Sequence, residues 1–236
     1  NGGTASGTLN TKPDFDTIIT ISAPTRTGYT FKGWTISGNL ERSTARWGTS
    51  NTALTNTITD AEFSTTGTIY VKNLSTLNGG TITLTAIWEE NSYTINFTGV
   101  YDSFVVKVVK ADGTVRTTKT ITSADNTIVV YYTDMLTVGS DGVSKNLDGL
   151  TFTKVTAGEY PTRLGYTLGN SAWKYFKITT ANSGWARYDG SWYTDGSTQL
   201  DVRCSTWSHF TANATIELLW TANTYTVTFD GNGGTP

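Results

Sequence analysis

The sequence predicts a mainly β protein in which one module occurs twice. Thr, Val, Ile, Tyr, Phe and Trp fill short alternating runs, and Gly, Asn and Asp interrupt these runs, as strands joined by tight turns require. Helix signals are scarce, and two long stretches of the chain repeat one another. The 236 residues are enough for two domains of about 100 to 130 residues, each with its own core.

The repeat consists of aromatic and small residues that return in a fixed order. The first set of pairs is Trp88 and Trp220, Asn91 and Asn223, Tyr93 and Tyr225, and Phe97 and Phe229, each 132 positions apart (220 minus 88). Upstream, Pro-Thr-Arg-Thr-Gly-Tyr-Thr at 24–30 is echoed by Pro-Thr-Arg-Leu-Gly-Tyr-Thr at 161–167, at a spacing of 137 (166 minus 29). A fixed order with variable spacers indicates a duplicated module. We define the repeat anchors as Gly28, Tyr29, Trp34, Trp88, Tyr93, Phe97, Gly165, Tyr166, Trp220, Tyr225 and Phe229.

The anchors also predict the module boundaries. The first module spans 1–92, the second spans 93–224, and 225–236 begins a third. Because Asn-Gly-Gly-Thr occurs at 1–4 and again at 232–235, we expect the chain to be part of a longer array. On this division the first module lacks its leading strand, and the segment from Tyr225 to Phe229 is a leading strand without its module. We expect that strand either to pair with the second module or to insert into the first module of a neighbouring molecule.

Local patterns predict individual elements. Large apolar residues alternate with polar ones from Tyr93 to Phe97, which predicts a strand with one buried face. The run from Phe104 to Arg116 predicts a hairpin that turns at Asp112-Gly113. The best helix signal is a single capped turn from Thr59 to Phe63.

The composition indicates an extracellular protein. Charged residues make up 15% of the chain, against roughly 25% in ordinary soluble domains, and Thr, Ser, Asn and 24 Gly supply the polarity instead. A net charge of -2 argues against a nucleic-acid partner or an anionic membrane, since both need a basic face. No apolar run reaches about 18 residues, so we expect no membrane insertion by this piece.

One Cys and one His leave little room for catalysis or metal binding. Cys204 and His209 fall on opposite faces of an uninterrupted strand, and a zinc site needs more ligands than they provide. We therefore expect no enzyme, no metal and no cofactor, with Cys204 filling the core. The oxygens of Asp-Gly-Asn-Gly-Gly at 230–234 suit calcium, but Gly and Asn there favour a turn.

Three pieces of the repeat together resemble the Listeria-Bacteroides repeat family, to which the B-repeats of internalin-type surface proteins belong. These pieces are Tyr-Thr-Val-Thr-Phe-Asp-Gly-Asn-Gly-Gly-Thr at 225–235, Pro-Thr-Arg-Thr-Gly-Tyr-Thr-Phe-Lys-Gly-Trp at 24–34 and Leu-Thr-Ala-Ile-Trp at 84–88. The resemblance implies β-grasp-like modules, α+β at most, strung in arrays on large bacterial cell-surface proteins. It also implies a secreted, cell-wall or cell-surface location and an extracellular ligand, protein or glycan, on the host.

The second module departs from the family pattern through insertions. It has Thr98-Gly99-Val100-Tyr101 in place of the Asp-Gly-Asn-Gly-Gly turn, and Trp173 stands where the first module has Trp34. Its inserted stretch is rich in aromatic residues flanked by planar polar ones, an arrangement that suits sugar rings. The candidate glycan-binding residues are Trp173, Trp185, Arg187, Tyr188, Trp192 and Tyr193. The alternative is that these aromatics fill the core.

Three functions therefore stay open: an adhesin stalk or spacer, a carbohydrate-binding module, and a fibre subunit that assembles by strand exchange. Buried aromatics in the insertion would favour the stalk, and an exposed platform would favour glycan binding. Lys72, Lys107 and Gln199 are candidates for side-chain cross-links that would resist pulling.

Overall fold

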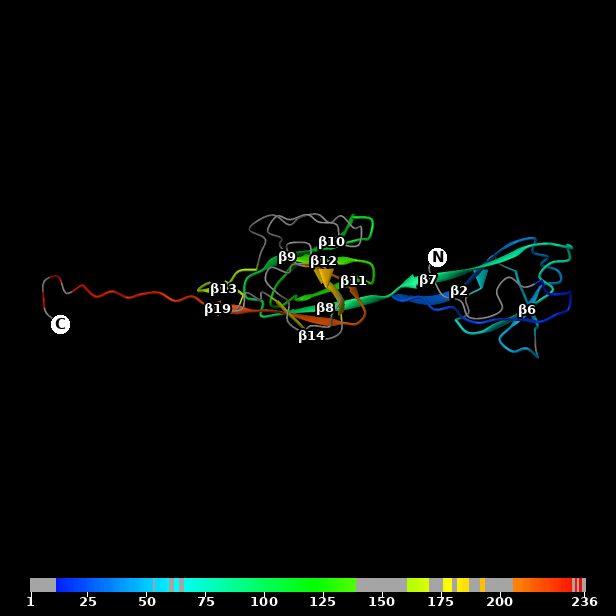
Figure 1. Ribbon diagram of the computed structural model, residues 1–236, viewed down its shortest axis with the longest axis horizontal. Helices are drawn as coiled ribbons and strands as arrows, with labels where there is room; N and C mark the ends of the chain where they lie inside the picture. Colours follow the sequence, from blue (N-terminus) through cyan, green and yellow to red (C-terminus); the bar gives the residue numbers. More distant parts are fainter. Residues whose placement is uncertain are drawn as a thin grey trace. The chain divides into compact units, whose positions relative to one another are not determined.

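The structure is a computed structural model and consists of strands and connecting turns (Figure 1). It describes residues 12–52, 54–59, 62–63, 66–138, 161–169, 176–179, 182–186, 192–193, 206–230, 232 and 234. None of these residues lies in a helix, so the prediction of a mainly β protein is confirmed. The described residues accordingly include no helix long and apolar enough to cross a membrane. The chain divides into two compact units, Asn1–Asn91 and Ser92–Pro236, one residue before the boundary expected from the repeat.

The first unit packs two sheets around one core. Its strands are β1 (Ile19–Ile21), β2 (Tyr29–Gly38), β3 (Arg46–Gly48), β4 (Asn56–Thr57), β5 (Glu62–Phe63), β6 (Ile69–Lys72) and β7 (Ile82–Glu90). The sheets have the strand orders β1-β6-β3-β4 and β5-β2-β7, and all pairs are antiparallel. Both sheets contribute to the core, whose buried residues are Phe31, Trp34, Ile36, Ala45, Ile58, Ile69 and Val71.

The predicted helical turn from Thr59 to Phe63 is wrong. Glu62 and Phe63 instead form β5, opposite Thr35 and Trp34 of β2. An isolated helical turn fixes several residues for one hydrogen bond, whereas an existing strand edge provides partners directly. The tertiary context therefore overrides the local signal.

The second unit has more strands and a larger core. Its strands are β8 (Ser92–Thr98), β9 (Phe104–Val109), β10 (Val115–Ile121), β11 (Thr127–Tyr131), β12 (Met135–Val138), β13 (Tyr166–Leu168), β14 (Phe176–Thr179), β15 (Asn182–Ala186), β16 (Trp192–Tyr193), β17 (Thr206–Phe210), β18 (Ala214–Leu218) and β19 (Trp220–Ala222). They form sheets of order β10-β9-β12-β17-β15-β16, β11-β8-β18-β14 and β13-β19. The first two sheets enclose the core.

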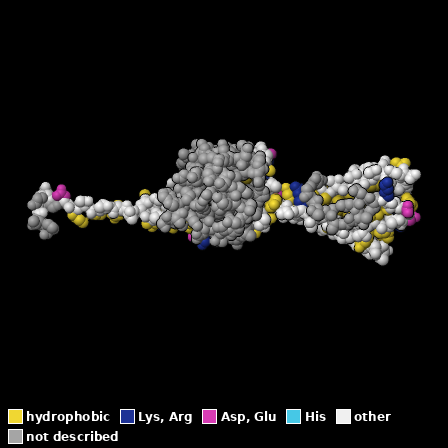
Figure 2. All heavy atoms as spheres, in the orientation of Figure 1, with side chains coloured by type: hydrophobic (Ala, Val, Ile, Leu, Met, Phe, Trp, Pro, Cys, Tyr) yellow, Lys and Arg dark blue, Asp and Glu magenta, His cyan; other side chains and the backbone are white. Residues whose placement is uncertain are grey.

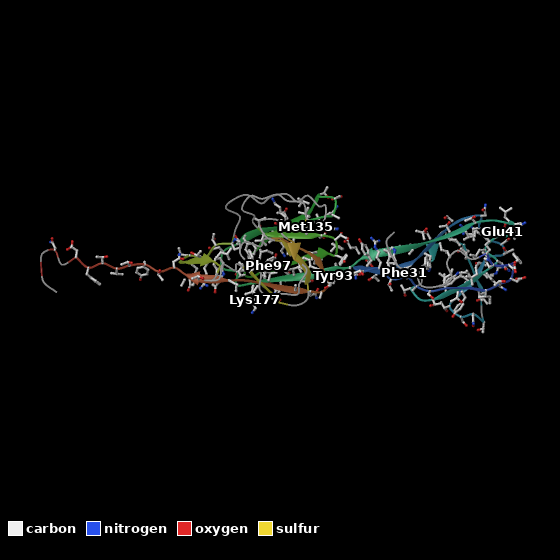
Figure 3. All side chains as sticks on the ribbon, viewed as in Figure 1. Phe31, Glu41, Tyr93, Phe97, Met135 and Lys177 are labelled. Atoms are coloured by element: carbon white, nitrogen blue, oxygen red, sulfur yellow. The ribbon has the colours of Figure 1, made fainter. Side chains whose placement is uncertain are left out.

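Strand β8 lies in the middle of its sheet and behaves as its alternating sequence predicts. It pairs antiparallel with β11 and parallel with β18. Ile95 and Phe97 have no exposed surface, and Tyr93 packs against the same core; Figure 3 places Phe97 inside this unit. The polar residues between them face away from the core, so one face of β8 is buried.

The hairpin predicted at Asp112-Gly113 is confirmed. Strands β9 and β10 pair antiparallel, and Gly113 adopts a φ of 83°. Asp112 Oδ1 accepts hydrogen bonds from Thr114 Oγ1 at 2.6 Å and Thr114 N at 2.9 Å. The hydrogen bond from the Thr114 side chain lowers the pKa of the Asp112 carboxyl most, and the bond from Thr114 N lowers it further.

The segment after β19 has no strand partner among the described residues. Residues 224–230 belong to no strand, and Tyr225, Val227 and Phe229 are 88%, 60% and 91% exposed. Figure 1 shows this segment without a strand beside it, and Figure 2 shows its hydrophobic side chains uncovered. The expected pairing with the second module is therefore wrong, because β8 already fills the place beside β18 that a strand of this sequence takes.

Candidate functional site

Both units end in the same small structure, which we call the closing motif. It joins the Arg-x-Gly-Tyr-Thr turn before one strand to the Trp-x-x-Asn end of its antiparallel partner. In the first unit these strands are β2 and β7, and in the second they are β13 and β19. The closing motif contains most of the repeat anchors.

In the first unit, backbone and side-chain hydrogen bonds close the motif. Tyr29 N donates to Arg26 O at 3.1 Å, and Gly28 bridges this turn with a φ of 78°, a conformation that favours glycine. Asn91 N donates to Gly28 O at 2.9 Å. Thr30 Oγ1 donates to Asn91 Oδ1 at 2.7 Å. Asn91, which joins β7 to β8, is thus held by the turn of its own unit.

The second unit repeats each of these contacts. Tyr166 N donates to Arg163 O at 3.1 Å, and Gly165 has a φ of 77°. Asn223 N donates to Gly165 O at 2.9 Å, and Thr167 Oγ1 donates to Asn223 Oδ1 at 2.7 Å. Contacts that recur in the same order at matching residues show that the two ends are copies of one local structure.

The strand registers extend this match. Phe31 lies opposite Trp88, and Leu168 lies opposite Trp220. A glycine with positive φ follows in both units, Gly33 at 142° and Gly169 at 111°, and in the first unit it marks a bulge. Beyond this glycine the second unit contains residues 170–175 before its strand resumes at β14.

Phe176, and not Trp173, takes the place of Trp34. Trp34 lies opposite Ala86 of β7, and Phe176 lies opposite Leu218 of β18, which are matching positions of the repeat. Trp34 and Phe176 are both buried in the cores of their units. Trp173 lies outside the described residues.

In the second unit, the chain that follows β8 covers the closing motif. Trp220 Nε1 donates to the carbonyl oxygen of Gly99 at 2.8 Å, and the Tyr101 ring meets the Trp220 ring edge to face, with centres 6.1 Å apart. The guanidinium carbon of Arg163 lies 3.7 Å from the centre of the Tyr101 ring and 3.4 Å from that of Tyr166. Arg163 is therefore placed against two aromatic rings.

In the first unit, the corresponding place is a hollow of about 470 Å³. The residues that line it are Pro24, Thr25, Arg26, Thr27, Tyr29, Phe31 and Trp88. Arg26 stacks on Tyr29, with its guanidinium carbon 3.6 Å from the ring centre. Trp88 Nε1 is buried and has no hydrogen-bond partner in the part of the chain that the structure describes. A buried donor without an acceptor is costly, so this hollow is a candidate binding site.

The predicted glycan-binding residues are only partly described. Trp173, Arg187 and Tyr188 lie outside the described residues, while Trp185 lies in β15 and Trp192 and Tyr193 lie in β16. The register puts Trp185 opposite Tyr193 and opposite Trp207 of β17.

That row of the sheet continues into Leu136 of β12 and Val108 of β9. Both of these residues belong to the core of the second unit. The backbone register thus places Trp185 in a row with core residues, and the glycan platform stays a prediction.

The structure describes some of the other residues considered in the sequence analysis. Cys204 and Gln199 lie outside the described residues, and His209 lies in β17. Lys72 and Lys107 are half-buried in β6 and β9. Asn232 N donates to Asp230 Oδ1 at 2.9 Å, with a φ of 44° at Asn232, as a turn there requires. The described part of the chain holds no group of three or more His, Cys, Asp or Glu that could bind a metal.

Comparison with protein-family models, with curated proteins and with solved structures gives no match. The family resemblance of the anchors therefore stays a prediction from the residues. Within the site, sequence reasoning missed the roles of Gly99, Tyr101 and the Arg residues. The Arg residues belong to the two echoed runs and could have been found there, whereas nothing in the sequence places Tyr101 against Arg163.

Proposed function

We propose that this chain is a non-catalytic stretch of a bacterial cell-surface protein, in which tandem modules serve as the stalk or spacer of an adhesin. The low charge of the chain and the resemblance of its anchors support an extracellular location. The single His and single Cys support the absence of catalysis. The site that binds the ligand of the whole adhesin, a host protein or a glycan, would lie on other parts of the protein or on the inserted stretch of the second unit.

The observation that carries this proposal is the connection between modules. Strand β7 ends at Glu90 and β8 begins at Ser92, so Asn91 alone connects them. Asn91 is held by hydrogen bonds to Gly28 and Thr30, and Asn223 is held in the same way at the end of the second unit. This short, hydrogen-bonded connection supports the proposal, because we expect it to allow a smaller range of angles between modules than a flexible linker does.

The proposal predicts a narrow range of distances between neighbouring modules. Spin labels at Leu77→Cys and Val129→Cys, two exposed positions in different units, on a Cys204→Ala background, report this distance by electron spin resonance. We expect one narrow distribution, and we expect Asn91→Gly to broaden it while both units stay folded. A broad distribution in the chain with Asn91 intact would contradict a spacer role.

A further inference from the structure

Among the described residues, strand β7 has a neighbouring strand on one edge alone, whereas its counterpart in the second unit, β18, has one on each edge. The sequence repeat matches Ile82, Leu84 and Ala86 of β7 to Ala214, Ile216 and Leu218 of β18. Strand β18 pairs with β14 on one side and β8 on the other, whereas among the described residues β7 pairs with β2 alone. The three residues of β18 are buried, at 4%, 0% and 3% exposed, and those of β7 are half-buried. A missing neighbouring strand accounts for this difference.

The sequence of the missing neighbour occurs in the chain itself. In the second unit it is β8, in which Tyr93, Ile95 and Phe97 face the core. The repeat matches these residues to Tyr225, Val227 and Phe229, which are largely exposed and lie in an unpaired segment. The free edge and the free strand are therefore complementary parts of one repeated structure.

The hollow in the first unit gives an independent indication of the same occupant. In the second unit, Trp220 Nε1 donates to the carbonyl of Gly99, directly after β8. The matching donor in the first unit, Trp88 Nε1, is buried and has no partner among the residues described. In the sequence repeat, Gly99 matches Gly231, which directly follows Asp230, so we expect docking of residues 225–230 to bring a matching acceptor to Trp88.

We propose that residues 225–230 of a second copy of this chain add to the free edge of β7 as a parallel strand. The register of β8 on β18 pairs Ile95 with Ala214, Asn96 with Thr215 and Phe97 with Ile216. Transferred through the repeat, Val227 pairs with Ile82, Thr228 with Thr83 and Phe229 with Leu84. The proposal rests on the repeat geometry and not on the adhesin role.

Strand addition of this kind is directional. The donor strand belongs to the end of one copy, and the acceptor edge belongs to the first unit of the next. Such a heterologous contact leaves a donor free at one end of the assembly and an acceptor free at the other. Copies therefore join head to tail, with side chains at alternate positions of the donor strand facing the core.

Disulfide cross-linking between different chains tests the register. Chains carrying Thr83→Cys are mixed with chains carrying Thr228→Cys, both on a Cys204→Ala background, and oxidised. We expect a covalent dimer of the two chains in severalfold higher yield than with the control mixture of Thr83→Cys and Thr226→Cys. The control cysteine is on the same face of the donor strand but two residues out of register. Equal yields from the two mixtures would contradict the proposal.

Self-association tests the occupant. The mass of the full chain, measured by light scattering, should rise with concentration, and a synthetic peptide of residues 223–236 should cap the edge and return the mass to that of one chain. The variant Val227→Asp with Phe229→Asp should stay monomeric, whereas Thr226→Asp with Thr228→Asp, on the other face of the strand, should still associate. A full chain that is monomeric at every concentration, or association that the Val227 and Phe229 changes leave intact, would overturn the proposal.

Discussion

Gly28 and Gly165 hold the turn of the closing motif in a left-handed backbone conformation, with φ values of 78° and 77°. The carbonyl oxygens of these glycines then accept hydrogen bonds from Asn91 and Asn223. In most L residues the side chain disfavours this conformation by roughly 1–2 kcal/mol. The repeat thus keeps glycine at this position for a backbone reason, and the reason is local to each unit.

Gly165→Ala should destabilise the second unit by about 1 kcal/mol through backbone strain alone. A Cβ at Gly165 would meet no atom within 4 Å, so crowding does not contribute. Gly165→Asn is the matched control, because Asn tolerates the left-handed region better than Ala does. In urea unfolding of the second unit, the free energy of unfolding should be highest for wild type, lower for Gly165→Asn and lowest for Gly165→Ala. A Gly165→Ala variant as stable as wild type would contradict the backbone explanation.

The hydrogen bonds to Asp112 predict that the stability of the second unit depends on pH in the acid range. Because Thr114 lowers the pKa of the folded carboxyl below its ordinary value of 3.8, the stabilising contribution of the carboxylate is complete above that value. It is lost as the pH falls through the lower folded pKa. The difference in unfolding midpoint between wild type and Asp112→Ala should therefore narrow in strong acid. Thr114→Ala should show a smaller narrowing, since it removes the side-chain hydrogen bond and leaves the one from the backbone N of residue 114. A difference between wild type and Asp112→Ala that is constant with pH would exclude this role.

At the scale of elements, the second unit shows how a leading strand completes the closing motif. Strand β8 fills the edge of β18, and the chain after it brings Gly99 to Trp220 and Tyr101 to Arg163. Gly99 has a φ of 70°, and a Cβ there would lie 2.7 Å from the carbonyl oxygen of Leu218. The close approach of these two backbones depends on glycine.

Stacking of Arg163 on Tyr101, in addition to Tyr166, should add measurably to the free energy of unfolding of the second unit. Each stacking of an exposed cation on an aromatic ring contributes about 0.5–1 kcal/mol, so Arg163→Ala should cost about 1–2 kcal/mol. Arg26→Ala is the control in the first unit, where Arg26 stacks on Tyr29, and it should cost about half as much. Chemical denaturation that resolves the two units gives both values. Equal losses would show that Tyr101 contributes nothing to this stacking.

The alternation of residues was sufficient to predict β8, and turn chemistry was sufficient to predict the hairpin at Asp112-Gly113. The matching ends of the two units also followed from the sequence, because their hydrogen bonds use residues that recur in fixed order. The match of Trp34 to Phe176 did not follow, since the six residues 170–175 lie between Gly169 and Phe176 in the sequence and change the spacing. The predicted helical turn at Thr59 to Phe63 was wrong because Glu62 and Phe63 pair with β2, a strand distant in the sequence, and local signals cannot anticipate such pairing.

At the scale of the whole molecule, the repeat predicts one rule of construction: the chain after each closing motif is the leading strand of the following unit. Strand β8 follows the closing motif of the first unit through Asn91 and is an inner strand of a sheet of the second unit. Residues 225–229 follow the second closing motif through Asn223 in the same way. In a tandem array such a strand would be used within the chain, and between separate copies it would be used for assembly.

Hydrogen exchange on an extended chain tests this rule most directly. Residues 6–91 are appended after Pro236, which keeps the repeat in phase because Asn-Gly-Gly-Thr at 232–235 matches 1–4. At a concentration at which the chain is monomeric, the amides of residues 225–230 in the 236-residue chain should exchange as fast as those of an unstructured segment. In the extended chain they should become protected together with the appended unit. An appended unit that folds while residues 225–230 stay unprotected would contradict the account.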